Sequence, residues 1–231
     1  MKETLPRYPV SIHLAGNRVV MVGGGGVAER RVAGLLAAGA LLIVVSPELT
    51  PRLESLAGEG KILWVRRSYQ AGDLTGARLA FGMAADPQVN QEVGREARSL
   101  GIWVNLGTDP DASDFHVPAV LSRGGIQVAI ATNGSSPVLA AYVRRKLSLE
   151  IDEAYGVLAR LLGQVRRALK EKGIRPNERA RVLWLLTESD LLELVRAQML
   201  RSRSERSWEE VNSLVREMSG LALFSYSDGD Q

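Results

Sequence analysis

The chain has 231 residues, 45% of them hydrophobic and 24% charged, proportions typical of a globular protein with one α/β domain and a smaller helical part. The lack of cysteine excludes disulfides and thiolate chemistry, and no apolar run approaches the roughly 20 residues of a membrane span. A net charge of +3 with 5% aromatic residues disfavours nucleic-acid binding, and residues 1–6 lack the apolar core of a signal peptide, so we expect a cytoplasmic protein without nucleic-acid or membrane partners.

The first element is a strand at Val19–Val22 that runs into four glycines and then a helical stretch, Glu29–Gly39. Gly23, Gly25 and Ala28 occupy the three special positions of the G-x-G-x-x-G/A fingerprint. A helix that starts there would direct free N–H groups and the positive end of its dipole at a pyrophosphate. A flexible glycine turn is the plain alternative, and the surrounding β-α-β pattern argues against it.

A second strand, Leu41–Val45, begins about twenty residues after the first, as the dinucleotide fingerprint requires. It ends at Ser46, Pro47 and Glu48. Glu48 can reach a ribose 2′-hydroxyl, and no arginine stands directly there to receive a 2′-phosphate, so the pattern favours NAD over NADP. Glu48 as a solvated loop carboxylate is the alternative.

Three more apolar runs continue the pattern and alternate with two helical stretches. The runs are Ile62–Val65, Leu79–Met83 and Ile102–Val104, and the helices are Pro51–Gly58 and Pro87–Leu100. Strands that alternate with helices predict a Rossmann-like parallel sheet, with ligands at the carboxyl ends of its strands.

Three carboxylates follow the last of these strands. Asp109, Asp111 and Asp114 lie where a strand end would face a cofactor crevice, and crowded like charges raise a pKa toward general acid–base use. A polar loop whose Asp residues cap turns explains the same pattern. The only histidines, His13 and His116, are far apart in sequence, and G-x-S-x-G is absent, so we expect neither a resident metal nor a serine hydrolase.

Beyond this loop, Phe115–Leu121 leads through two glycines to a strand, Ile126–Ala131, and then to a helix from Pro137 through Lys146. Ser136 is the expected N-cap of that helix, although its N–H and hydroxyl groups also suit an acidic ligand. Tyr142 and Lys146 match the Y-x-x-x-K spacing of short-chain dehydrogenases. The glycine loop lacks the spacing of that family, so we interpret this match as coincidental.

The chain is predicted to be helical from Leu149 onward, with an apolar stripe from Leu158 to Leu169 and a break at Gly173–Pro176. Further helices are expected around Val182–Leu186, Leu191–Leu200 and Trp208–Met218, before a frayed tail at Ser225–Gln231. A helix-turn-helix role is disfavoured by the balanced charge of this part. We divide the chain into a dinucleotide-binding domain, 1–113, a dimerisation and substrate segment, 114–149, and a helical domain, 150–231.

Taken in order, the motifs of residues 7–150 resemble the precorrin-2 dehydrogenase family, the module of siroheme synthases. The resemblance lies in the ordered set Tyr8–Val10, Val20–Arg30, Val45–Glu48, Ala84–Asn90, Asn105–Pro110, Asp114–Ala119 and Asn133–Ala140. It implies NAD-dependent oxidation of precorrin-2 to sirohydrochlorin, with iron insertion by some members. It also implies a homodimer in which about Asp114–Leu149 crosses between subunits.

The resemblance also assigns residues. Its cofactor positions are Gly23, Gly25, Gly26 and Val27 for the pyrophosphate loop and Ser46, Pro47 and Glu48 beside the adenosine ribose. Its substrate positions are Asn105, Asn133, Ser135 and Ser136. A substrate with eight carboxylates suits a basic partner, for which Arg123, Arg144 and Arg145 are candidates.

One position departs from the family. The run after the family's Asn commonly ends in an Asp proposed as the general acid–base, and here Thr108 stands at that position with Asp109 after it. We take Asp109 and Thr108 as the candidate catalytic pair. Removing pyrrole protons for metal insertion needs a base, which Thr cannot supply at neutral pH, so we expect inefficient ferrochelatase activity. An NAD-sensing regulatory module is the alternative outside catalysis, and it would leave the motifs after residue 110 unexplained.

Overall fold

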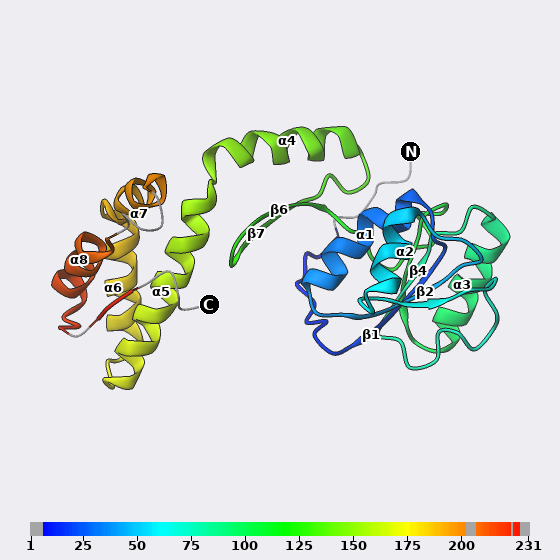
Figure 1. The fold of residues 1–231 in the computed structure, drawn as a ribbon, viewed down its shortest axis with the longest axis horizontal. Helices are drawn as coiled ribbons and strands as arrows, with labels where there is room; N and C mark the ends of the chain where they lie inside the picture. The colour runs from blue at the N-terminus through cyan, green and yellow to red at the C-terminus, as the bar shows by residue number, and fades with distance from the viewer. Residues whose placement is uncertain (1–6, 202–206, 223, 227–231) are drawn as a thin grey trace. The chain divides into compact units, whose positions relative to one another are not determined.

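The computed structural model describes residues 7–201, 207–222 and 224–226. They divide into two compact units that meet in sequence between Val117 and Pro118. Figure 1 shows the elements of each unit, which are described separately below. The sequence-based boundary at 113/114 lies four residues earlier, and the division at 149/150 falls inside the second unit.

The first unit is built on a five-stranded parallel sheet of order β3-β2-β1-β4-β5. This confirms the predicted Rossmann-like fold. Its strands are β1 (Arg18–Val22), β2 (Leu41–Val45), β3 (Leu63–Val65), β4 (Leu79–Gly82) and β5 (Trp103–Leu106). The strand order reverses between β1 and β4, so the carboxyl ends of these two strands border the crevice where such sheets bind ligands.

Helices cover both faces of the sheet because neighbouring strand residues point to opposite sides. Val19 and Met21 of β1 pack with α1 (Gly26–Ala37) and α2 (Pro51–Gly58), whereas Val20 and Val22 pack with α3 (Pro87–Ser99). Burial on both faces explains why the central strands are almost continuously apolar. The predicted helix from Glu29 to Gly39 begins three residues earlier and ends two residues sooner, since Gly39 takes a left-handed φ of 74°.

The connection from β3 to β4 contains no helix and is held by ionisable side chains instead. Arg67 makes two hydrogen bonds with the Asp73 carboxylate, at 2.6 and 2.7 Å, which lower the pKa of that carboxyl. The Glu96 carboxylate accepts from the Tyr69 hydroxyl and from the backbone N–H groups of Gly72 and Leu74. Burial and this hydrogen bond raise the pKa of Tyr69, so its phenol is neutral. These hydrogen bonds therefore fix the conformation of the connection from β3 to β4.

The second unit begins with an antiparallel hairpin, β6 (Ala119–Arg123) and β7 (Ile126–Ile130), followed by α4 (Pro137–Glu150) and α5 (Glu153–Glu171). The hairpin turn lies directly against α5, where a Cβ on Gly156 would stand 2.7 Å from the Arg123 carbonyl oxygen. Arg123 donates from Nε to the Ile151 carbonyl at 3.1 Å and pairs with Glu153 at 3.4 Å. Arg123 therefore helps to fix the hairpin.

Helices α5, α6 (Pro176–Glu188), α7 (Leu191–Leu200) and α8 (Glu209–Ser219) share one apolar core. Leu161, Val165 and Leu186 are fully buried in it. The expected frayed tail is wrong at Tyr226, which is buried and packs edge-on against Trp208 at 4.9 Å between ring centroids, while 227–231 lie outside the described residues. The same holds for residues 1–6, on which the signal-peptide expectation depends. Across the described residues, no helix has the length and apolarity that a membrane crossing needs.

Candidate functional site

The glycine-rich loop after β1 is packed so closely that its first two glycines have no room for a side chain. Gly23 has a φ of 111°, and a Cβ there would lie 2.4 Å from the Met83 carbonyl oxygen. A Cβ on Gly24 would lie 2.3 Å from the Glu48 carbonyl oxygen. The loop is thus fitted between the chain segments that follow β4 and β2.

Gly25 and Gly26, by contrast, face open space, with no atom within 4 Å of a Cβ built on either. Gly25 is the N-cap of α1 and makes no side-chain capping hydrogen bond. The first N–H groups of a helix have no partner within it, so here they are free to bind an anion. Val27 is exposed in the same turn. A pyrophosphate fits this cradle, because glycines keep its approach open and backbone N–H groups line it.

The segment after β2 is joined to the glycine loop by one backbone hydrogen bond and is stabilised by a second hydrogen bond of its own. The Thr50 N–H donates to the Gly24 carbonyl at 3.0 Å, and the Ser46 hydroxyl donates to the Glu48 carbonyl at 2.7 Å. Pro47 and the Glu48 side chain are exposed. The structure therefore brings together the residues predicted for the pyrophosphate and for the adenosine ribose.

Trp64 of β3 supports this segment and was missed by the sequence analysis. Its indole Nε1–H donates to the Ser46 carbonyl at 2.9 Å, and the Arg66 guanidinium lies 4.9 Å from the centre of its ring. A tryptophan in a short apolar run suggests only a core residue. Its polar contact depends on the pairing of β3 with β2, which only the structure shows.

At the opposite side of the crevice, Asn90 connects the segments that follow β4 and β5. Its buried side chain bonds the backbone of Ala84 and also the hydroxyl of Thr108. Thr108 and Asp109 are exposed at the end of β5, where the sequence predicted them. Asp109 accepts the Ala112 N–H at 3.0 Å, so one of its carboxylate oxygens caps a turn.

The other polar residues near β5 serve the fold. Asn105 is buried and donates to the Phe115 carbonyl at 2.8 Å. Asp114 accepts the Val104 N–H at 2.9 Å. The side chains of Asn105 and Asp114 thus hold the segment that leads out of the sheet, and neither points to chemistry by its contacts.

The predicted substrate loop belongs to the second unit, between β7 and α4. Asn133 has a left-handed φ of 50°, and Ser135 is exposed beside it. Ser136 caps α4 by accepting the Leu139 N–H at 3.1 Å, as expected. In α4, Arg145 and Lys146 lie 5.6 and 5.8 Å from the ring centre of Tyr142, so the Y-x-x-x-K pair is part of a cation–π cluster.

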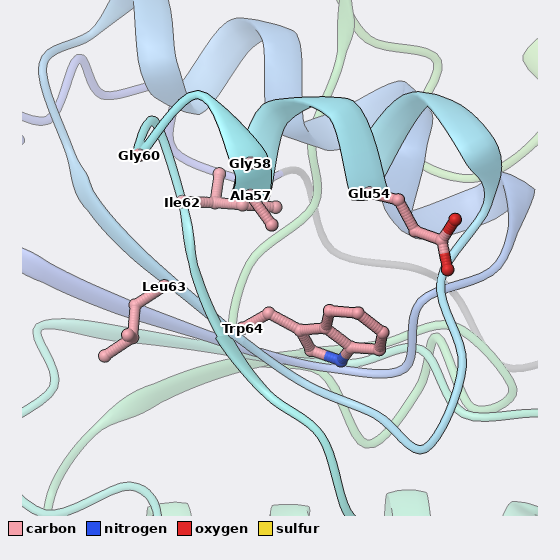
Figure 2. A pocket seen from close by; sticks show the side chains of 7 residues that line it. All are labelled: Glu54, Ala57, Gly58, Gly60, Ile62, Leu63 and Trp64. Carbon is pink, nitrogen blue, oxygen red and sulfur yellow. The ribbon is translucent and has the colours of Figure 1, made fainter.

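A shallow pocket lies between α2 and β3 and shares Trp64 with the residues described above (Figure 2). Figure 2 shows it lined by Glu54, Ala57, Gly58, Gly60, Ile62, Leu63 and Trp64. Most of these residues come from the carboxyl end of α2 and from β3, which is an edge strand of the sheet. Within the described part of the chain, no group of three or more His, Asp or Glu residues gathers as a metal site.

Family models match both units. The model described as "Putative NAD(P)-binding" covers residues 10–119, and the one described as "Sirohaem biosynthesis protein central" covers residues 123–148. The first match includes the glycine cradle, the segment after β2 and Thr108. Residues 7–117 thus form a domain for a nicotinamide dinucleotide, consistent with the fit of the cradle.

Similar proteins extend this finding. The chain is 39% identical over 188 residues to a siroheme synthase of Chromobacterium violaceum and 36% identical over 184 residues to siroheme synthase 1 of Aeromonas salmonicida. These alignments cover 81% and 80% of this chain but 40% and 39% of the relatives, so the chain spans about two fifths of their length. A solved structure titled SirC, precorrin-2 dehydrogenase, has the same fold, with a TM-score of 0.71, 24% identity, and coverage of 91% of this chain and 100% of that one.

Proposed function

We propose that the chain belongs to the precorrin-2 dehydrogenase family, which includes the matching module of siroheme synthases, and that it oxidises precorrin-2 to sirohydrochlorin with NAD. The observation that carries the proposal is the intact glycine cradle within a chain that matches both modules in order. A bound nicotinamide supplies the hydride acceptor of such an oxidation. The chain itself must hold cofactor and substrate together and accept one proton.

The proposed cofactor residues form two groups, one in the glycine loop after β1 and one in the segment after β2. The N–H groups of Gly25, Gly26 and Val27 would bind the pyrophosphate, and Gly23 keeps the loop close to Met83. Glu48 would accept from the adenosine ribose, with Ser46 and Pro47 shaping the approach. The exposed Glu48 carboxylate repels a 2′-phosphate, which supports NAD over NADP.

Asp109 is our candidate for the proton acceptor. Its Oδ1 accepts from the Ala112 N–H, and the carboxylate stands in an exposed turn at the end of β5. Thr108, whose oxygen already accepts a hydrogen bond from Asn90, is a neutral donor. Without a second base at the position of Thr108, we expect slow metal insertion into sirohydrochlorin, with the ferrous or cobaltous ion as substrate.

We also propose that Asn133, Ser135 and Ser136 border the substrate, that Asn105 contributes only by fixing the segment after β5 through its hydrogen bond to Phe115, and that the chain is a homodimer. A stripe of α4 supports the dimer: Val138, Tyr142 and Leu149 lie on one helix face and are 79%, 47% and 75% exposed. A second copy of the chain that packs on residues 119–149 would cover this stripe. Exposed apolar side chains gathered on one face of a helix are typical of a protein–protein interface.

The test is anaerobic turnover of precorrin-2 by the purified chain. We expect NADH and sirohydrochlorin to appear in equal amounts with NAD and much more slowly with NADP. Asp109→Asn is the matched variant, because an amide oxygen can still cap the Ala112 N–H. It should fold and bind NADH but oxidise precorrin-2 slowly. No NADH from fresh substrate would refute the dehydrogenase, and NADH binding without turnover would favour the sensing module.

A second assay addresses metal insertion. Sirohydrochlorin and cobaltous ion are mixed with the wild-type chain and with Thr108→Asp. We expect little insertion by the wild type and a measurable gain in the variant, since a carboxylate there can accept pyrrole protons. Efficient insertion by the wild type would show that another base serves.

A further inference from the structure

Asn90 makes three hydrogen bonds outside its own helix although its side chain is buried. Its Oδ1 accepts from the Ala84 N–H at 2.9 Å, and its Nδ2 donates to the Ala84 carbonyl at 2.9 Å. The amide thus pairs with one residue of the segment after β4 as a neighbouring strand would. A buried amide is costly to leave unpaired, so these contacts fix Ala84.

The third hydrogen bond reaches the next strand. The Nδ2 of Asn90 lies 3.2 Å from the Thr108 hydroxyl oxygen, beyond the end of β5. A side-chain amide nitrogen only donates, so the threonine oxygen is the acceptor and its own proton must point elsewhere. Thr108 is an exposed residue, so its hydroxyl proton is available to a ligand in a direction that the Asn90 contact restricts.

The strip formed by Ala84, Asn90 and Thr108 continues to the glycine cradle. A Cβ on Gly23 would lie 2.7 Å from the Ala84 nitrogen, so the glycine loop and the segment after β4 touch through backbone atoms. The adenosine half of a dinucleotide lies toward the end of β2, and its other half extends across the switch point over β4 and β5. The strip lies on that second path.

We propose that Asn90 is a positioning residue for the nicotinamide half of the cofactor, and that it acts by presenting the Thr108 hydroxyl as a hydrogen-bond donor to that half. The proposal rests on the proposed function only in its choice of cofactor. Capping does not explain Asn90, because α3 is already started by Pro87 and capped by Asp86, whose carboxylate accepts the Gln88 N–H at 2.8 Å. The side chain of Asn90 instead bonds the two segments at the crevice, which follow β4 and β5.

The test compares binding of NADH with binding of ADP, which lacks the nicotinamide half, by calorimetry on the full chain. Thr108→Val removes the hydroxyl at nearly constant volume and should weaken NADH about fivefold while ADP changes less than about twofold. Thr108→Ser keeps the hydroxyl and should restore NADH affinity. Since Thr108 is exposed, both variants are expected to fold.

Asn90→Asp keeps the shape of the side chain but, when ionised, loses both donations. It should weaken NADH by at least as much as Thr108→Val, and the double variant should be no weaker than Asn90→Asp alone, because the two residues act through one hydrogen bond. Circular dichroism checks that this variant folds. If it does not, the serine and valine variants decide.

Two results would overturn the proposal: wild-type NADH affinity in Thr108→Val, or equal weakening of ADP and NADH in both Thr108→Val and Asn90→Asp, which marks a purely structural role. These outcomes are separate from failure of the proposed function. A chain that binds NADH with the expected pattern but does not oxidise precorrin-2 keeps Asn90 in its role. A wild type that binds neither NADH nor ADP refutes the cofactor assignment and this proposal together.

Discussion

The sheet of residues 7–117 and the hairpin of residues 119–130 differ in how far they bury their side chains. β1, β2 and β4 are buried on both faces except at the first residue of β1 and β2, whereas β6 and β7 bury Leu121 and leave most of their other side chains partly or fully exposed. Helix α4 likewise buries only Ala140. The first unit completes its own packing, and the hairpin with α4 does not. We therefore expect cofactor binding to belong to one copy of the chain and the hairpin segment to depend on a second.

The largest effect is expected where the first unit is tightest. Gly23→Ala places a Cβ 2.4 Å from the Met83 carbonyl oxygen at a φ that L-residues rarely adopt. The overlap and the backbone strain together should weaken NADH binding roughly 100-fold or more, measured by nicotinamide fluorescence. Gly34→Ala is the matched control, since nothing lies within 4 Å of a Cβ there. Near-native NADH affinity in Gly23→Ala would show that the glycine loop can shift to make room for a side chain.

The opposite side of the comparison is tested on α4. Val138→Asp puts a charge in the exposed stripe of Val138, Tyr142 and Leu149, and it should convert a dimer to a monomer in light scattering, because a buried charge without a partner is strongly unfavourable. NADH affinity should stay within about twofold, since binding is assigned to residues 7–117.

Leu200→Asp is the control for this variant, because Leu200 of α7 is 89% exposed and lies outside the segment assigned to the dimer. It should leave the dimer intact. A monomeric wild type, or dissociation by both variants, would contradict the proposed interface.

Elements that depend on local sequence were predicted, whereas contacts between distant strands were not. The helical patterns Pro51–Gly58 and Leu191–Leu200 predicted α2 and α7 with their bounds, and the start signal at Ser136 and Pro137 predicted where α4 begins, since all three depend on local sequence. The hydrogen bond from Trp64 to Ser46 and the three hydrogen bonds of Asn90 depend on which strands become neighbours. Asn90 has no role that the Ala84–Asn90 motif predicts, because its partners Ala84 and Thr108 lie 6 and 18 residues away.

A smaller effect is expected at the end of β2, in cofactor choice. Glu48→Arg replaces a carboxylate that repels a 2′-phosphate with a cation that binds one, so the ratio of NADPH to NADH affinity should rise about tenfold. Glu54→Arg makes the same change of net charge on α2, where the side chain is also exposed. An equal shift in both variants would mean that overall charge, and not the ribose contact, sets the preference.

The smallest effect is expected at Trp64, which supports the first unit's site without facing the cofactor cradle. Trp64→Phe keeps an aromatic ring but removes the Nε1–H that donates to the Ser46 carbonyl at 2.9 Å. One neutral hydrogen bond is worth about 1 kcal/mol, so ADP and NADH should both weaken about fivefold or less in calorimetry. Trp103→Phe on β5, at the other edge of the sheet, is the control. ADP and NADH affinity should fall equally, since the adenosine half is common to both ligands. For Thr108→Val, by contrast, the loss is expected mainly for NADH. If only NADH affinity fell, Trp64 would act on the nicotinamide half of the cofactor, which would contradict this prediction.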